Sequence, residues 1–342
     1  MATPDVVEST ITSSSFQSCN LDDLSPSNME SESLKSKKQK AIEWGRPGHL
    51  TPTEVQIFSQ FRDEVNKRGG EFRNTVYSFT EEEGEAYTLT RWLRARKYNL
   101  QDTITMVEQA TECRVQPRQF DYYPNPEEAL GCPPEIFVNQ YPQLYSGFSK
   151  IGCPVYYSKP GQLEIDGVEC ITTLDGILKY HWHVMQHDYK RRLLEFKKQN
   201  PSFKRFECVS VLDLSNLTLS KLGSRTMEII KKQASIDSLC FPETMNKMII
   251  VNAPRFFSAT WSIIKGFIDA RTSAKVELFS SMTAAEKCLK EIIDVDQLPS
   301  DYGGTAESTV VTMEKMSQGN KLTTQILYIR YGIESDAYFE CF

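Results

Sequence analysis

The spacing of apolar residues changes along the chain and predicts two kinds of structure. Between residues 51 and 114 the pattern is helical. Pro52 follows Thr51 at a first-turn position, and Leu89, Trp92 and Leu93 recur at the spacing of one helix face. Glycines break this region into several pieces. We therefore expect a small unit of helices over residues 45–115.

Beyond about residue 117, strand patterns alternate with helical ones. The apolar segment at 208–214 is typical of a strand buried on both faces of a parallel sheet. Shorter strands are expected at 154–157 and 248–251, and long helices at 174–198 and 222–238. This alternation predicts an α/β domain with parallel strands over residues 116–305, closed by a turn that carries Gly303 and Gly304.

An unusually apolar helix is expected directly after the strand that ends near Val251. Pro254 separates the two, and a set of apolar residues then recurs along one helix face: Phe257, Trp261, Ile264 and Ile268. Further apolar residues widen that face: Phe256, Ile263 and Phe267. The next segment, 269–275, is polar and basic. An apolar helix beside hydroxyl and ammonium groups suits a ligand with an apolar body and an anionic head, so we predict phospholipid binding.

Composition restricts the function classes further. The 342 residues are 40% hydrophobic, which suffices for a buried core, and the formal net charge of −6 argues against a nucleic-acid-binding protein. The nine cysteines are odd in number and form no CxxC pair, so we expect a reducing, cytoplasmic compartment rather than a disulfide framework. No apolar run approaches the roughly 18 residues of a membrane span, so membrane contact should be peripheral. Residues 1–44, rich in Ser, Thr and acidic residues, are expected to form a disordered tail.

Three histidines lie close together in the predicted helix at 174–198. His183 and His187 are four residues apart, a spacing that metal ligands use, and Tyr189 lies two residues further on. His187 and Tyr189 are residue types that can hold haem iron. However, the aromatic residues around them favour an ordinary polar helix. Motifs for serine hydrolases, nucleoside triphosphates and dinucleotides are missing from the sequence, so we expect neither catalysis nor a metal or cofactor.

Four motifs follow one another along the chain: WLRARKY at 92–98, VLDL at 211–214, FPETM at 241–245 running into IVNAP at 250–254, and LPSDYGG at 298–304. In this order they resemble those of the CRAL-TRIO lipid-binding family, in particular its secretory-pathway phosphatidylinositol/phosphatidylcholine transfer proteins. Together they span about residues 45–305. The resemblance implies a helical N-terminal unit beside a domain in which a parallel-rich sheet forms the floor of an apolar pocket. Residues 306–342 would then be a C-terminal extension.

The same resemblance assigns a mobile gate helix over the pocket. Its apolar residues are expected to meet lipid tails when the gate is closed and the bilayer when it is open. The residues assigned to it are Phe256, Phe257, Trp261, Ile264, Phe267 and Ile268. The family's Gly-Gly turn maps onto Gly303 and Gly304, and such turns often need conformations that other residues resist.

The resemblance also assigns a phosphatidylinositol headgroup site. The residues that match the family's motifs are Arg96 with the adjacent Lys97, Glu243, Thr272 and Lys275. Their chemistry is coherent, because a phosphate diester and an inositol ring need a cation, a hydroxyl donor and an acceptor. Thr272 and Lys275 are one helical turn apart. Glu243 is suited to accept from inositol hydroxyls or to orient Arg96.

A site for a second lipid, phosphatidylcholine, is less well matched. The family uses hydroxyl residues on the strand before its D-L motif, and here those positions are Cys208 and Ser210. A thiol is a weak hydrogen-bond donor. Tyr156 stands where the family offers an aromatic residue, which suits a cation–π contact with choline. An ordinary strand tyrosine is an equally good interpretation of Tyr156, so phosphatidylinositol is the ligand that the sequence favours.

The function implied by the resemblance is non-enzymatic phosphatidylinositol transfer. A monomer would extract one phospholipid, shield its tails and exchange it at another membrane. The implied setting is cytoplasmic, with transient contact to Golgi and endosomal membranes in support of vesicle trafficking. Phosphoinositide kinases would be indirect partners that receive the lipid. Two alternatives stay open: a carrier of haem or another hydrophobic ligand on the same fold, and a protein-interaction scaffold that uses the C-terminal extension.

Overall fold

The computed structural model describes residues 43–79, 83–266 and 270–317. The chain divides between Ile104 and Thr105 into two compact units, which are described separately here. The predicted tail at 1–44 therefore lies almost wholly outside the described residues, as do Phe267, Ile268 and most of the predicted C-terminal extension.

Helices account for the first unit, as the sequence predicts. They are α2 (Pro52–Arg68), α3 (Gly70–Val76), α4 (Glu85–Ala95) and the start of α5 (Leu100–Cys113). Thr51 begins α2 with a reciprocal cap, in which its hydroxyl accepts from the Glu54 amide and its own amide donates to the Glu54 carboxylate at 2.8 Å. Phe58 and Phe61 from α2 and Leu89 from α4 are fully buried.

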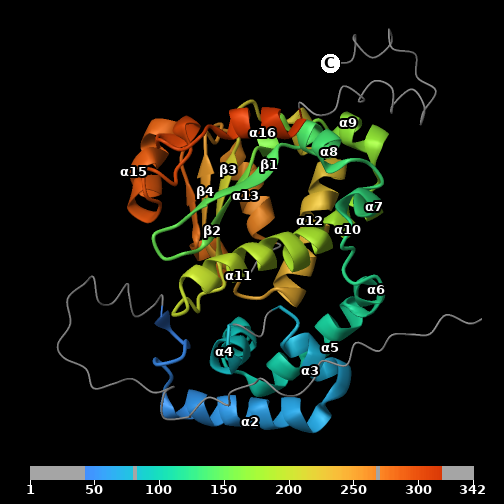
Figure 1. Ribbon diagram of the computed structural model, residues 1–342, viewed down its shortest axis with the longest axis vertical. Coiled ribbons are helices and arrows are strands. Elements are labelled where there is room, and N and C mark those ends of the chain that lie inside the picture. The colour runs from blue at the N-terminus through green and yellow to red at the C-terminus, as the bar shows by residue number, and fades with distance from the viewer. Residues whose placement is uncertain (1–42, 80–82, 267–269, 318–342) are drawn as a thin grey trace, which may run out of the picture. The chain divides into compact units, whose positions relative to one another are not determined.

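A five-stranded sheet organises the second unit (Figure 1). The strands are β1 (Gln143–Phe148), β2 (Pro154–Ser158), β3 (Cys208–Asp213), β4 (Met245–Val251) and β5 (Val276–Leu278), in the spatial order β1-β2-β3-β4-β5. The three predicted strands are confirmed. The β1–β2 pair is antiparallel and the other neighbouring strands are parallel, so the sheet is mostly parallel, as the fold class requires.

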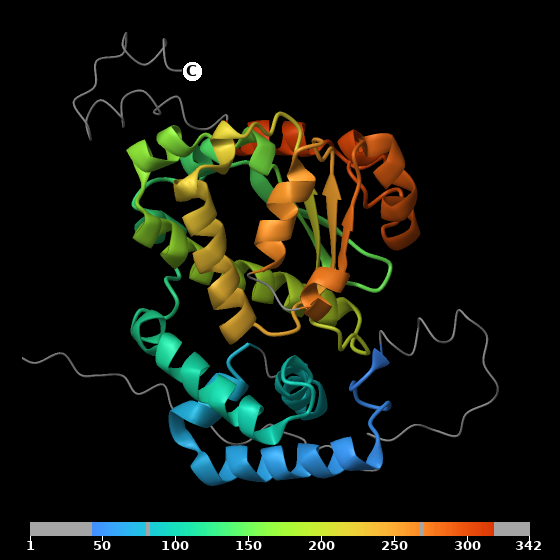
Figure 2. The same cartoon turned by 180° about the vertical axis from the view of Figure 1, so that it is seen from behind.

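Helices cover the sheet on both sides (Figures 1 and 2). α15 (Met282–Ile292) lies on one side. The other side carries α10 (Leu174–His183), α11 (Lys190–Gln199), α12 (Ser224–Cys240) and α13 (Phe257–Lys265). The remaining helices are α6 (Val115–Gln119), α7 (Pro126–Leu130), α8 (Pro134–Gln140), α9 (Ile165–Ile171), α14 (Ala270–Ala274) and α16 (Thr309–Ser317).

The two faces of the sheet differ in how completely they are buried. Val209 and Val211 of β3 are 0% exposed and belong to the core that includes Leu289 of α15. Ser210 and Leu212 alternate with them and stay partly exposed. Because successive strand residues point to opposite faces, the face toward α13 is the one that keeps accessible surface at the centre of the sheet.

The long helix predicted at 174–198 is present but is not uniform. A six-residue π-helix, Val184–Tyr189, joins α10 to α11. Each π turn accommodates an extra residue, which rotates all later side chains relative to a regular α-helix. The direction of a side chain on α11 therefore cannot be predicted by extending the regular α-helical spacing of α10.

Candidate functional site

Glu243 and Lys275 meet where two parallel strands begin. Glu243 lies just before β4, and Lys275 lies between α14 and β5. The Lys275 ammonium is 3.2 Å from Glu243 Oε2 and donates to the Met245 carbonyl oxygen at 2.8 Å. The Glu243 side chain is 7% exposed and that of Lys275 is 23% exposed. The charged end of the pair is thus anchored by protein but reached by solvent.

Local backbone geometry explains how these residues come together. Glu243 has φ 58°, a left-handed conformation that turns the chain from Pro242 into β4. The Lys275 amide donates to the Thr272 carbonyl at 3.1 Å, which fixes Thr272 one turn before Lys275. β5 then pairs with β4, with Val276 opposite Met248. Three of the predicted headgroup residues therefore lie at the amino edge of the sheet.

Arg96 and Lys97 belong to the first unit. Arg96 directly follows α4 as its C-cap. It is partly exposed, and its guanidinium donates to the Ala95 carbonyl at 3.1 Å. Lys97 is exposed and has φ 52°, followed by Tyr98 at φ 59°. The buried Tyr98 hydroxyl donates to the Gly45 carbonyl and fixes this turn. Their role with Glu243, Thr272 and Lys275 stays a prediction.

α13 occupies the position predicted for the gate. Phe257 is 4% exposed and packs with Ile250 of β4. Trp261 and Ile264 are partly buried in the same cluster, whereas Ile263 is 59% exposed. The helix therefore presents apolar side chains both to the partly exposed face of the sheet and to solvent.

The residues predicted for a second lipid lie together on that same face. Tyr156 is paired with Ser210 in the β2–β3 register, and Cys208 begins β3. The Tyr156 hydroxyl donates to the Gln143 side chain, and burial raises the pKa of this tyrosine well above its usual value. Burial also raises the pKa of Cys208 to about 12, so its thiol is neutral. Whether a lipid contacts them stays a prediction.

Arg192 lies near these residues, although the sequence did not single it out. Its guanidinium lies over the Tyr145 ring, 5.0 Å from the centroid, and burial lowers its pKa. Its buried Nε has no hydrogen-bond partner among the described residues. Tyr145 stacks on Tyr189 at 6.1 Å and lies 5.0 Å from the Tyr156 ring. In the sequence, Arg192 is one of three successive cations, and nothing there distinguishes it from its neighbours.

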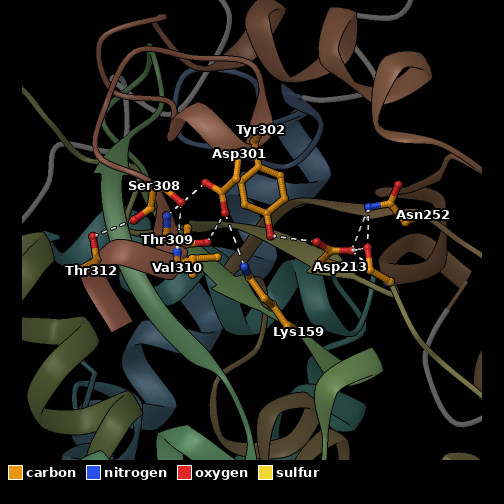
Figure 3. Close-up of polar contacts among 10 residues, drawn as sticks. Lys159, Asp213, Asn252, Asp301, Tyr302, Ser308, Thr309, Val310 and Thr312 are labelled. Atoms are coloured by element: carbon orange, nitrogen blue, oxygen red, sulfur yellow. Dashed lines mark hydrogen bonds and ion pairs between the residues drawn. The ribbon is translucent and has the colours of Figure 1, made fainter. Parts of the chain in front are cut away.

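The carboxyl edge of the sheet carries a second polar network (Figure 3). Asp213, at the end of β3, accepts from Asn252 Nδ2 at 2.9 Å and from the Tyr302 hydroxyl at 3.3 Å. Lys159, which follows β2, lies 3.4 Å from Asp301. The Asp301 carboxylate also accepts from the amide of Thr309, the first residue of α16, at 3.0 Å.

The turn beside this network contains the two predicted glycines. Gly303 has φ 88°, which is the conformation expected of a Gly-Gly turn. Gly304 is required for a different reason, because a Cβ there would lie 1.8 Å from the Leu298 carbonyl oxygen. The need at Gly304 is therefore close approach of the backbone, not a left-handed conformation.

The side chains of His187 and Tyr189 form hydrogen bonds with different parts of the chain. His187 Nε2 donates to the Asp121 carbonyl at 2.8 Å, and His183 Nδ1 bonds the Tyr123 carbonyl at 2.8 Å. Tyr189 is 1% exposed and its hydroxyl donates to the Thr244 carbonyl at 3.4 Å. The structure thus does not join the two side chains into one ligand set. No group of three metal-ligating side chains is found within residues 43–79, 83–266 and 270–317.

Comparison with known proteins identifies the family. Residues 57–109 match the family model of the CRAL/TRIO N-terminal domain, and residues 139–304 match that of the CRAL/TRIO domain. Together the two matches cover most of the chain in the order that the four motifs predict. The chain therefore belongs to the CRAL/TRIO family, which confirms the resemblance.

Several relatives of the chain are named as transfer proteins, and one is named a cytosolic factor. The chain is 27% identical over 270 residues to the Sec14 cytosolic factor of Schizosaccharomyces pombe, a match that covers 77% of this chain and 86% of the relative. It is 25% identical over 265 residues to the Arabidopsis thaliana phosphatidylinositol/phosphatidylcholine transfer protein SFH9, covering 73% of this chain and 43% of that protein. For SFH13 of the same plant the identity is 31% over 231 residues, and the match covers 65% of this chain and 35% of SFH13. The chain thus spans less than half the length of these two plant proteins.

A solved structure supports the architecture. The crystal structure of Sfh5 superposes with a TM-score of 0.52 at 16% identity, covering 79% of this chain and 99% of that one. The likeness concerns the fold alone and confirms the predicted α/β domain with an N-terminal helical unit. Among the helices that the structure describes, none combines the length and apolarity needed to cross a membrane.

Proposed function

We propose that this protein binds phosphatidylinositol and transfers it between membranes without catalysing a reaction. The observation that carries the proposal is the Lys275–Glu243 pair at the amino edge of the sheet. In the chain, the apolar helix α13 lies between Glu243 and Lys275, so both residues of a site for an anionic headgroup flank the segment that carries the apolar helix. The names of the family relatives support the same ligand class.

Lys275 retains donor capacity for a ligand. An ammonium has three N–H donors, and here two of them reach the Glu243 carboxylate and the Met245 carbonyl. Among the described residues no third acceptor is found, so the remaining N–H can donate a charge-assisted hydrogen bond to a lipid phosphate. Glu243 holds the ammonium in place and offers a carboxylate oxygen to inositol hydroxyls. The Thr272 side chain follows one turn earlier and supplies a hydroxyl.

The partly exposed face of the sheet is suited to the acyl chains. Leu212, Met248 and Ile264 of α13 share one apolar cluster there. Displacement of α13 would uncover this cluster, and the 59% exposed Ile263 is already placed to meet a bilayer. We infer that α13 opens at the membrane and closes over the lipid tails.

Phosphatidylcholine is disfavoured in this proposal. Choline recognition would use the aromatic faces near Tyr156, but the Arg192 guanidinium already lies over the neighbouring Tyr145 ring. The guanidinium would repel the choline ammonium of phosphatidylcholine, whereas the uncharged inositol ring of phosphatidylinositol would not be repelled. We expect Arg192→Met to increase phosphatidylcholine uptake from vesicles. Unchanged or lower uptake in a folded variant would contradict this part of the proposal.

The cellular role follows only if transfer is established. We propose that the protein presents phosphatidylinositol to phosphoinositide kinases from the cytoplasm, as a monomer in transient contact with Golgi or endosomal membranes, and so supports vesicle trafficking. The resemblance and the relatives' names support this setting. Co-localisation with Golgi markers that is lost when Lys275 is replaced would support it, and uniform cytoplasmic distribution of both forms would contradict it.

The direct test of the proposal is a transfer assay with labelled phosphatidylinositol, from donor to acceptor vesicles. The wild-type protein is expected to accelerate transfer, and Lys275→Ala is expected to remove most of that acceleration. A wild-type protein that moves no phosphatidylinositol would overturn the proposal. Equal activity of the two forms would overturn the headgroup assignment alone.

A further inference from the structure

One partly buried cation of the second unit has no counter-ion among the described residues. Arg192 belongs to α11, and its side chain is only partly exposed. Its buried Nε has no hydrogen-bond partner, and the part of the chain that the structure describes gives its guanidinium no ion pair. Arginine keeps its positive charge in proteins, and a charge withdrawn from water is costly unless an opposite charge is close. The group that this position lacks is therefore an anion.

The preceding residue shows what the ordinary surroundings of an arginine on this helix are. Arg191 is 54% exposed and pairs with Asp188 at 3.6 Å and with Glu195 at 2.9 Å. Arg192 instead lies over the Tyr145 ring, 5.0 Å from its centroid. A ring face attracts a cation but carries no net charge, so it does not neutralise the guanidinium. Of two adjacent arginines, one is paired at the surface and the other is left with an uncompensated charge beside the sheet.

A row of partly exposed side chains leads from this cation across the sheet. Tyr145 is paired with Tyr156, Tyr156 with Ser210, and Ser210 with Met248, and all four are partly exposed. Residues paired in this way lie on the same face of a sheet. Met248 packs against the apolar cluster to which α13 contributes. The row thus begins at a cation and ends at an apolar cluster.

The length of this row indicates the kind of ligand that would fit it. Three inter-strand spacings separate Tyr145 from Met248, which amounts to roughly 14 Å. A small anion such as phosphate or acetate would reach the cation alone. An amphiphile with an anionic head and a long tail would reach both ends of the row, with its tail among the apolar contacts that α13 makes.

We propose that Arg192 is the anion-binding residue of a site for a fatty-acid-like amphiphile, a long apolar tail whose head is a carboxylate or a phosphate monoester. The terminal nitrogens of a guanidinium can donate two parallel hydrogen bonds to either head. The neighbouring rings of Tyr145 and Tyr156 keep part of the water away, which strengthens the ion pair. A head that carries its own cation is excluded by repulsion. The site is independent of the Lys275–Glu243 pair.

The test is a titration of the full chain with cis-parinaric acid, a fluorescent fatty acid, and separately with its methyl ester. The two probes share one tail and differ in the charge of the head. The acid should bind at least about tenfold more tightly than the ester, because only the acid can form a charge-assisted pair with the guanidinium. This comparison needs no variant, and equal affinities for the acid and the ester would overturn the proposal.

Two adjacent substitutions assign the charge effect to one residue. Arg192→Met keeps an apolar stem and removes the charge, so affinity for the acid should fall at least about tenfold, to that of the ester. Affinity for the ester should stay within about twofold, which also shows that the variant is folded. Arg191→Met is the matched control and should bind the acid within about twofold of the parent. An equal loss in both variants, or acid binding unchanged in folded Arg192→Met, would overturn the proposal.

Competitors distinguish the sources of the anion. Palmitate carries a carboxylate and phosphatidic acid a phosphate monoester; displacement of cis-parinaric acid by either, weakened in Arg192→Met, supports the site and identifies its preferred head. Phosphatidylcholine should compete at least about tenfold less well, and equal competition by all three would contradict the charge requirement. Lys275→Ala should bind the probe like the parent, so failure of phosphatidylinositol transfer and failure of this site are separate results. Probe binding that depends on Lys275 and not on Arg192 would contradict the proposal.

Discussion

The polar groups at the two edges of the sheet differ in their exposure to solvent and in their hydrogen-bond partners. At the carboxyl edge, Asp213 accepts from both Asn252 and Tyr302, and the Lys159 side chain beside Asp301 is only 5% exposed. At the amino edge, the Lys275 side chain keeps 23% exposure, and within the part of the chain that the structure describes it has one N–H beyond its two acceptors. The first network joins the ends of β3 and β4 to the turn before α16, and so supports the fold. The second has capacity left for a ligand, which is the difference expected between a structural and a binding network.

The largest effect should come from the turn beside the carboxyl edge. Gly304→Ala places a Cβ against the Leu298 carbonyl, and we expect the free energy of unfolding to fall by about 4 kcal/mol or more. Urea denaturation measures it. Gly223→Ala is the matched control, because its Cβ would meet the Ser220 carbonyl at an ordinary 3.5 Å, and it should cost less than about 1 kcal/mol. Equal stability of the two variants would show that the turn is not a close approach.

A smaller loss of stability is expected from Asp213→Ala. The change removes the acceptor of the Tyr302 hydroxyl and one of the two acceptors of the Asn252 amide, which should lower the free energy of unfolding by about 3 kcal/mol. Asp213→Asn keeps one acceptor oxygen, so its free energy of unfolding should lie between those of the parent and Asp213→Ala. Thermal or urea unfolding of the three proteins measures this order. If Asp213→Ala is as stable as the parent, the carboxyl-edge network is not structural.

The amino edge should behave in the opposite way. Lys275→Ala is expected to lower phosphatidylinositol transfer by more than about tenfold, because a charge-assisted hydrogen bond to phosphate is lost. Its stability should change by less than about 2 kcal/mol, because the side chain is partly solvated. Vesicle transfer and urea unfolding are measured on the same preparation.

Lys247→Ala is the matched control for that experiment. The Lys247 side chain is 24% exposed and paired with Glu277 at 2.6 Å, but it reaches Cys288 of α15 on the other face of the sheet. Transfer by this variant should stay within about twofold of the parent. A similar loss in both lysine variants would mean that general surface charge, and not the Lys275 site, supports transfer.

The smallest effect is expected from the hydroxyl at the amino edge. Thr272→Val keeps the shape of the side chain and removes one hydrogen-bonding group, so phosphatidylinositol affinity should fall by about fivefold, or about 1 kcal/mol. A binding titration with vesicles measures it. Ser273→Ala removes a hydroxyl from the next position of α14 and should have less effect. The reverse order would reassign the hydroxyl contact from Thr272 to Ser273.

The sequence predicted those parts of the fold that have long, regular patterns. β3 and β4 appear as apolar runs, and the helices of the first unit follow from caps and spacing. β5 has only three residues, Val276–Leu278, with a glutamate in the middle, so no periodicity marks it. β1 is similarly obscured, because Gly147 and polar residues interrupt its apolar positions.

The candidate site was predicted unevenly for physical reasons. Glu243 and Lys275 follow from motifs, but their contact depends on strand pairing between β4 and β5, which the sequence does not state. Arg192 could not be singled out, because the π-helix before α11 changes which residues face the sheet. A run of cations on a helix normally indicates solvent exposure, and only the contact with Tyr145 distinguishes Arg192 from its neighbours.

The most direct test of the central claim is native mass spectrometry with lipid extraction, after incubation of the protein with vesicles that contain phosphatidylinositol and phosphatidylcholine. One phosphatidylinositol molecule is expected per wild-type chain, and Lys275→Ala should lose it while Lys247→Ala retains it. Phosphatidylcholine or haem as the bound ligand, or equal phosphatidylinositol occupancy in all three proteins, would contradict the assignment of the amino edge as the headgroup site.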